Sequence, residues 1–151
     1  MKIYIATDHA GFEMKEQLVP YLKKELGHDV VDMGAHKLDP LDDYPDFIAH
    51  AAREVSHEPG LARGIVIGGS GAGEAMVANR FRNVRCAVYY GGPLDILRLS
   101  REHNDANMLS LGARFLSNDE AKAAVKLWLD TAFTEEERHV RRLEKIEQIW
   151  P

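Results

Sequence analysis

Short apolar runs alternate along the chain with segments in which apolar residues recur at helical spacing. Ile65, Val66 and Ile67 follow one another with no polar residue between them, which is typical of a strand buried on both faces. Five runs have the length and composition of strands: Ile3–Ala6, Val30–Met33, Gly64–Ile67, Cys86–Tyr90 and Met108–Leu111. The alternation of strands with helices predicts an α/β sandwich around a mainly parallel sheet.

The helical segments also carry local signals of where they begin. Two capping boxes, Ser117-x-x-Glu120 and Thr134-x-x-Glu137, predict the starts of the last two helices. Two segments place apolar side chains on a single helical face: Ile48, Ala51, Ala52 and Val55 in one, and Ala121, Ala124, Val125, Trp128 and Ala132 in the other.

Two interruptions of the pattern matter for the fold. The first helical segment, roughly Gly11 to Leu26, contains Pro20, which is expected to kink or split the helix. The longest irregular stretch runs from Gly34 to Pro45. A loop of that length in a compact domain is expected to line a site.

Length and charge narrow the class of protein. The chain has 151 residues, so residues 1–151 are expected to form one domain. A net charge of −5 leaves no broad basic surface, which argues against binding to nucleic acid or to an anionic membrane. The lone Cys86 cannot form an internal disulfide, and no signal-peptide or membrane-span pattern is present, so a soluble cytoplasmic protein is expected. The histidines lack HxxxH and HExxH spacing, which predicts no metal site.

Two segments with unusual composition follow predicted strands, at the edge where open α/β sheets bind ligands. One is Thr7–Gly11, and the other is the glycine-rich segment Gly68–Glu74. A glycine-rich turn between a strand and a helix exposes backbone N–H groups that bind anions, although a tight turn also needs small residues. Glu74 stands where a Walker loop has its lysine and where a dinucleotide fingerprint has its third glycine, so a nucleotide site is not favoured.

Three kinds of residue could carry chemistry or could simply stabilise helices. Glu74 in the first turn of a helix interacts favourably with the helix dipole, or serves as a general base. His103 follows a helix predicted at about Leu94–Glu102, where it caps the helix or acts on a ligand. Arg138 and Arg142 lie one helical turn apart, as on a solvated face or in a phosphate clamp.

Taken in order, five blocks of this sequence resemble the ribose-5-phosphate isomerase B family, which is grouped with the subunits of galactose-6-phosphate isomerase. The resemblance spans nearly the whole chain, from the first strand to the last helix. The blocks are Asp8-His9-Ala10-Gly11, Asp43-Tyr44-Pro45, Gly69-Ser70-Gly71-Ala72-Gly73-Glu74, Arg101-Glu102-His103-Asn104-Asp105-Ala106-Asn107 and Arg138-His139-x-x-Arg142.

The resemblance implies a three-layer, Rossmann-like α/β/α sandwich with a five-stranded, mainly parallel sheet. It implies an aldose–ketose isomerase without a cofactor, which interconverts ribose 5-phosphate and ribulose 5-phosphate through a cis-enediolate. It also implies a homodimer, or a tetramer that contains it, with the C-terminal helix at about 134–150 packed on a partner subunit.

Position by position, the resemblance implies that Glu74 is the base, because Gly68 stands where another branch of the family has a catalytic cysteine. Asp8 and His103 are implied in opening the sugar ring, and Ser70 in moving protons between O1 and O2. The other implied contacts are anion-binding backbone groups of Gly69, Gly71 and Gly73, substrate contacts from His9, Tyr44 and Asn104, and phosphate contacts from Arg114, Arg138 and Arg142.

The place of His103 adds a geometric expectation. The helix predicted at Leu94–Glu102 must run back from the carboxyl edge of the sheet, and nine residues cover about 13 Å. His103 is therefore expected to lie far from Asp8 and Glu74 of its own chain. If all three act on one sugar, two chains of a two-fold dimer share each active site.

Two alternatives remain open from the sequence. The same chemistry could act on galactose, allose or tetrose phosphates, because the sequence does not fix the size of the pocket. A non-catalytic nucleotide-binding module, of the universal-stress or flavodoxin type, would share the sheet and the glycine loop. Such a module has no need for Glu74, His103 and two C-terminal arginines together.

Overall fold

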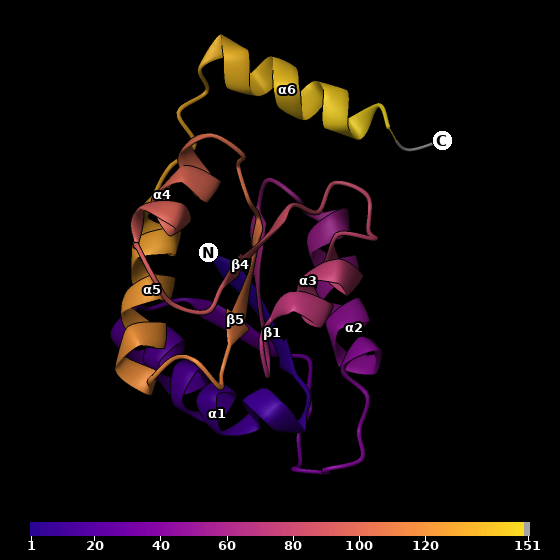
Figure 1. Ribbon diagram of the computed structural model, residues 1–151, viewed down its shortest axis with the longest axis vertical. Helices are drawn as coiled ribbons and strands as arrows, with labels where there is room; N and C mark the ends of the chain where they lie inside the picture. The colour runs from indigo at the N-terminus through magenta and orange to yellow at the C-terminus, as the bar shows by residue number, and fades with distance from the viewer. Residues whose placement is uncertain (150–151) are drawn as a thin grey trace.

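Figure 1 shows the computed structural model, which describes residues 1–149. All neighbouring strands in its five-stranded sheet run parallel, in the order β2-β1-β3-β5-β4. The strands are β1 (Lys2–Thr7), β2 (Asp29–Asp32), β3 (Ala62–Gly68), β4 (Cys86–Tyr89) and β5 (Met108–Gly112). The five predicted strands are confirmed.

In the described part of the chain, six α-helices accompany the sheet: α1 (Phe12–Pro20), α2 (Tyr44–His57), α3 (Ala72–Ala78), α4 (Asp95–Glu102), α5 (Asn118–Asp130) and α6 (Glu137–Glu147). A short 3-10 turn (His9–Gly11) precedes α1, and a π-helical segment (Tyr21–Glu25) follows it. The α-helical hydrogen-bond pattern therefore ends at Pro20, which confirms the expected split, since proline cannot donate to the carbonyl four residues before it. Among residues 1–149, no helix is long and apolar enough to cross a membrane.

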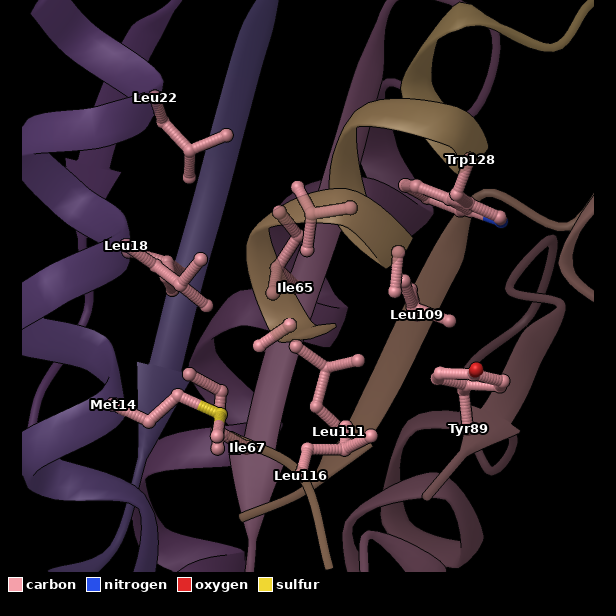
Figure 2. Close-up of a cluster of buried hydrophobic side chains, with 14 of the residues drawn as sticks. Met14, Leu18, Leu22, Ile65, Ile67, Tyr89, Leu109, Leu111, Leu116 and Trp128 are labelled. Carbon is pink, nitrogen blue, oxygen red and sulfur yellow. The ribbon is translucent and has the colours of Figure 1, made fainter. Parts of the chain in front are cut away.

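Alternate residues of the strands contribute side chains to two separate hydrophobic cores, one on each face of the sheet. Ile65, Ile67 and Leu109 pack with Leu18 of α1 and Trp128 of α5, as Figure 2 shows. On the other face, residues such as Tyr4, Ala6 and Val66 pack against Ile48, Ala51, Ala52 and Val55 of α2. These two cores make the three-layer, Rossmann-like α/β/α sandwich that was expected.

The two predicted capping boxes have different outcomes. The box at the start of α5 is confirmed, because Ser117 Oγ accepts the N–H of Glu120 and Glu120 accepts the N–H of Ser117. The box at Thr134 is wrong, because α6 begins at Glu137 and its N-terminus has no side-chain cap. The Thr134 hydroxyl instead donates to the carbonyl of Glu102, 2.8 Å away. This tertiary hydrogen bond uses the hydroxyl that the local sequence pattern predicted to cap the last helix.

Helix α6 lies at one end of the molecule, beside the C-terminal end of α4 (Figure 1). It is fastened there by an ion pair of 3.2 Å between Arg85 and Glu147 and by the burial of His139. The helix is shorter than the predicted segment 134–150, and the last residue of that segment lies outside the described residues.

The carboxyl ends of three adjacent strands bring distant loops together. Thr7 pairs with Ile67 across β1 and β3, and Gly68 pairs with Gly112 across β3 and β5. The irregular segment 33–43 joins the same edge, since the N–H of Thr7 donates to the carbonyl of Gly34 at 2.8 Å. The loops after β1, β2, β3 and β5 therefore meet at one edge of the sheet.

Candidate active site

The loop after β1 holds Asp8 in a fixed position at this edge. The carboxylate of Asp8 is buried and accepts the N–H of Ala10 at 2.9 Å, which caps the short 3-10 turn. The hydroxyl of Thr7 donates to the carbonyl of Ile67 at 2.8 Å and ties this loop to β3. Gly11 lies so close to Thr7 and Ile67 that any side chain there would overlap them.

The imidazole of His9 is bound to a carboxylate that the sequence analysis did not single out. Nδ1 of His9 lies 2.6 Å from Oδ1 of Asp42, and the backbone N–H of His9 donates to the same oxygen at 3.0 Å. The hydrogen bond to Asp42 raises the pKa of His9, with a smaller contribution from the charge of Asp8, while burial and Arg114 oppose the rise. Asp42 is 33 residues away, so no local pattern points to it.

Asp8, His9 and Asp42 each have one metal-ligand type of atom within 4.8 Å of the others. Two of these side chains are already engaged with each other, because Nδ1 of His9 is bound to Asp42. A cation at this position would have to break that bond in the neighbourhood of Arg114. The expectation that the protein has no metal site stays a prediction.

The glycine-rich segment after β3 is shaped by its neighbours. Gly71 adopts a left-handed conformation (φ 79°), and the buried hydroxyl of Ser110 donates to its carbonyl at 2.6 Å. A Cβ on Gly73 would lie 2.9 Å from the Tyr44 hydroxyl, and one on Gly69 would lie 3.1 Å from the Arg114 guanidinium. Glycine is thus favoured by backbone conformation at Gly71 and by the close approach of Tyr44 at Gly73, whereas a side chain on Gly69 would press against the flexible Arg114.

Ser70 and Glu74 present side chains from the same segment in different environments. Ser70 is exposed, and its hydroxyl accepts the N–H of Ala72 at 3.3 Å. Glu74 is only 4% exposed, and its carboxylate overlaps the volume that any side chain on Gly68 would fill. Burial raises the pKa of Glu74, a backbone hydrogen bond opposes this, and the charge of Asp8 raises it further. A buried carboxylate of this kind is suited to accept a proton at neutral pH.

A second group of predicted residues lies at the opposite end of the sheet, where the parallel strands begin. His103 is the C-cap of α4, and its ring stacks on that of His139, with centroids 4.2 Å apart and planes 14° apart. His139 is 2% exposed, and its pKa is lowered by burial first and then by His103 and the nearby arginines. Arg138 and Arg142 of α6 are exposed, and Arg138 pairs with Glu136 at 2.8 Å.

Arg85 links this second group to the body of the protein. Its Nε donates to the carbonyls of Asn104 and Asp105 at 3.1 Å each, and its Nη2 pairs with Asp105 at 2.9 Å. Its remaining Nη1 bonds Glu147 of α6 at 3.2 Å. One guanidinium therefore holds both the turn after His103 and the helix that carries Arg138 and Arg142.

The structure separates the two groups of predicted site residues. His103 and Asn104 come shortly before Met108, where β5 begins, whereas Arg114 follows Gly112, where β5 ends. The strand advances about 3.3 Å per residue, so its two ends are about 13 Å apart. The expectation that His103 lies far from Asp8 and Glu74 of its own chain is confirmed. The first group comprises Asp8, His9, Tyr44, Gly69, Ser70, Gly71, Gly73, Glu74 and Arg114, and the second comprises His103, Asn104, Arg138 and Arg142.

Sequence reasoning missed three residues that shape these groups: Asp42, Arg85 and Ser110. Each of them acts through a contact with a residue 19 or more positions away in the sequence. A pattern-based analysis has no signal for such pairs.

Comparison with known proteins places the chain among sugar-phosphate isomerases. Residues 3–146 match the family described as Ribose/Galactose Isomerase. The ribose-5-phosphate isomerase B of Mycobacterium leprae is 40% identical over 149 residues, which cover 99% of this chain and 90% of the relative.

Solved structures agree with the sequence comparison. The ribose-5-phosphate isomerase B of Mycoplasma genitalium, solved with bound ribulose-5-phosphate, has a TM-score of 0.92 and 35% identity, covering 98% of this chain and 95% of that one. The enzyme of the same name from Clostridium thermocellum has a TM-score of 0.91 and 41% identity, covering 99% and 97%.

Proposed function

The chain belongs to the ribose/galactose isomerase family, and we propose that it is an aldose–ketose isomerase that interconverts ribose 5-phosphate and ribulose 5-phosphate. The observation that carries this proposal is the buried carboxylate of Glu74, which lies against Gly68 beside the glycine-rich segment. The Mycoplasma genitalium relative was solved with the product of this reaction bound, which supports the choice of substrate.

The isomerisation step follows from the position of Glu74. With the aldehyde form of the sugar bound, Glu74 removes the proton from C2, and the electron pair forms the C1–C2 double bond of a cis-enediolate while the carbonyl oxygen becomes negative. The protonated Glu74 then delivers the proton to C1, which yields the ketose and regenerates the base. Backbone N–H groups of Gly69, Gly71 and Gly73 stabilise the negative oxygen. Loss of one such donor costs about 3 kcal/mol in comparable sites. The exposed Ser70 hydroxyl moves the proton between O1 and O2.

Ring opening precedes this step and needs two groups. One group takes the proton from the anomeric hydroxyl, and the other gives a proton to the ring oxygen as the C1–O bond breaks. Asp8 and His103 are the residues we propose for this pair. Because they lie at opposite edges of one chain, His103 must come from a second chain.

A two-fold dimer with shared sites follows from this separation. One chain supplies Asp8, Glu74 and the glycine-rich segment, and the other supplies His103, Asn104 and the Arg138–Arg142 clamp. Exposed apolar side chains on and beside α4 support a subunit interface there: Leu94, Ile96 and Leu99. A cavity of about 390 Å³ under α6, lined partly by Leu143 and Ile146, offers further surface for a partner.

The proposed reaction is tested by assaying ribose 5-phosphate isomerisation in the wild type and in E74Q. Activity in the wild type that falls at least about a hundredfold in E74Q supports both the reaction and the base. Activity that survives in E74Q contradicts the role of Glu74. A panel of pentose, hexose and tetrose phosphates, tested on the same preparations, decides whether another sugar phosphate is preferred.

The shared site is tested by mixing inactive chains. E74A and H103A chains are unfolded together and refolded, so that mixed dimers form. Each mixed dimer then has one intact site, and random pairing restores about a quarter of the wild-type activity. E74A mixed with G71A, whose lesion lies in the same group, is the control that stays inactive. No recovery with H103A contradicts a shared site.

A further inference from the structure

A single carboxylate oxygen, Oδ1 of Asp42, joins the irregular segment 33–43 to the loop after β1. The backbone N–H of His9 and Nδ1 of its ring both lie within hydrogen-bond distance of Oδ1 of Asp42, at 3.0 Å and 2.6 Å. The Asp42 side chain is only 9% exposed, and its other oxygen, Oδ2, is buried without a hydrogen-bond partner. A buried carboxylate with one oxygen unpartnered is costly. Within residues 1–149, the two bonds from His9 are the hydrogen bonds that the Asp42 carboxylate accepts.

These two bonds fix the orientation of the imidazole and the location of its proton. A carboxylate can only accept, so Nδ1 must carry a proton when it faces Asp42. The backbone bond to the same oxygen fixes the main chain of His9, and the ring bond fixes the side chain. Nε2 is then the ring nitrogen left to contact a ligand. A carboxylate bonded to one ring nitrogen of a histidine commonly fixes its proton and its orientation in this way.

The charges around His9 favour its protonated form. Asp42 faces it from the segment before α2, and Asp8 lies beside it, with Oδ2 3.9 Å from Nδ1. Arg114, in the loop after β5, is the opposing charge. The Asp42 bond is the largest of the influences on the pKa of His9, and it raises that pKa. Without Asp42, the cation at Arg114 would oppose protonation of His9 with only Asp8 to offset it.

We propose that Asp42 is a positioning residue that holds His9 as an imidazolium with its Nε2–H directed to an anionic oxygen of the substrate phosphate. The substrate contact of His9 and the phosphate contact of Arg114 are those that the family resemblance implies, so the new element is the dependence of His9 on Asp42. The inference rests on the proposed function for the identity of the ligand, although the state of His9 is measurable without any turnover.

The first test examines His9 itself. D42N keeps the size of the side chain and an accepting oxygen but removes the charge, and NMR titration of 15N-labelled imidazole follows His9 in both proteins. The apparent pKa of His9 is expected to fall in D42N, and it is expected to stay unchanged in D39N. Asp39 lies in the same segment, and its carboxylate accepts the local N–H of Leu41 rather than a group of His9, so D39N matches the charge change without removing a bond to His9. An unchanged His9 titration in D42N overturns the proposal.

The second test examines ligand binding. Inorganic phosphate is the probe, first in binding experiments and then as a competitive inhibitor of the isomerase. D42N is expected to weaken phosphate binding and to raise KM about tenfold, the loss typical of one charge-assisted bond, with kcat within about threefold. The loss of affinity with rising pH is expected to begin at lower pH in D42N than in the wild type. Unchanged affinity, or a fall in kcat alone, overturns the proposal.

These outcomes separate the inference from the proposed function. If ribose 5-phosphate is not isomerised but the titration of His9 and the binding of phosphate respond to D42N, the role of Asp42 stands and the reaction does not. If isomerisation is observed and neither quantity responds, the reaction stands and the role of Asp42 does not.

Discussion

The carboxylate of Glu74 lies in the space that a side chain on Gly68 would fill. Gly68 ends β3, and Glu74 lies in the first turn of α3, so two backbone positions can deliver a functional group to one point at the sheet edge. The two groups exclude each other, because both cannot occupy that point. A cysteine at the first position, of the kind that the resemblance implies for another branch of the family, could not share that point with the carboxylate of a glutamate at the second.

Gly68→Ala should displace the base. Even a methyl group at this position overlaps the carboxylate, so Glu74 must move, and activity should fall at least about a hundredfold. Gly60→Ala is the matched control, because a Cβ there meets no atom within 4 Å. Isomerase assays and melting temperatures of both variants provide the check. Full activity in G68A would show that the observed position of the carboxylate is not needed.

The double variant G68C/E74A should recover part of the activity that E74A lacks. Removing the Glu74 side chain opens the space that the new thiol needs, and a thiolate there could remove the C2 proton. Treatment with iodoacetamide should abolish the recovered activity. The native Cys86 should not interfere, because burial raises the pKa of its thiol and keeps it protonated. Recovered activity that resists alkylation would contradict the assignment of the new cysteine as base.

The pH dependence of both rate and stability should report on Glu74. Burial raises its pKa above the ordinary 4.5 in the free protein, so kcat/KM should fall on acidification at a higher pH than for an exposed carboxylate. The same shift means that the folded protein favours the neutral form. The stability it contributes is present below pH 4.5 and is lost as the pH rises through the raised pKa. E74Q should therefore have a higher melting temperature than the wild type at pH 7, and the difference should shrink toward pH 4.

Ser110→Ala should loosen the glycine-rich segment. The Ser110 hydroxyl is buried and donates to the Gly71 carbonyl, which also accepts the N–H of Ala75 at 3.1 Å. Its removal therefore leaves that carbonyl with one partner and costs about 0.5–1.5 kcal/mol, the net value of one hydrogen bond. We expect kcat to fall as well, because the donors of the segment lose their fixed positions. Ser100→Ala is the comparison, since the Ser100 hydroxyl bonds within α4, to the carbonyl of Leu97. Equal kcat values for both variants would exclude a role for Ser110 in shaping the site.

His139 should make the docking of α6 sensitive to acid. Its pKa is lowered below the ordinary 6.5, so the stability it contributes is present above that pH and is lost as the pH falls. His139→Phe keeps a flat ring against His103 but cannot titrate, and its melting temperature should change less between pH 7 and pH 5. His36→Gln, at an exposed position, should leave the wild-type slope unchanged. A wild-type slope in H139F would assign the acid sensitivity to another group.

The sequence predicted those parts of the fold that depend on neighbouring residues. The apolar run Ile65–Ile67 identified a central strand, Pro20 marked the end of a helix, and Ser117 with Glu120 marked the start of another. In each case the deciding interactions lie within a few residues of one another. Burial of both faces of β3 and the capping geometry of α5 therefore appear directly as sequence patterns.

Tertiary contacts explain what the sequence did not predict. Thr134 has the pattern of a helix cap, but Glu102, 32 residues away, takes its hydroxyl. Asp42 stands next to a recognised block and has no pattern of its own, since its importance comes from His9, 33 residues earlier. The five blocks predicted which residues form the candidate site, whereas their division between the two ends of the strands follows from the direction of α4 and β5.

That division has a consequence for the genetics of the protein. Residues of the first group and residues of the second lie at opposite ends of the strands in each chain. In a shared-site dimer, an allele damaged at Glu74 and an allele damaged at His103 would rescue each other when expressed in the same cell. Two alleles damaged in the same group would not. A table of which mutant pairs complement would therefore sort active-site residues by sheet edge without any further structure determination.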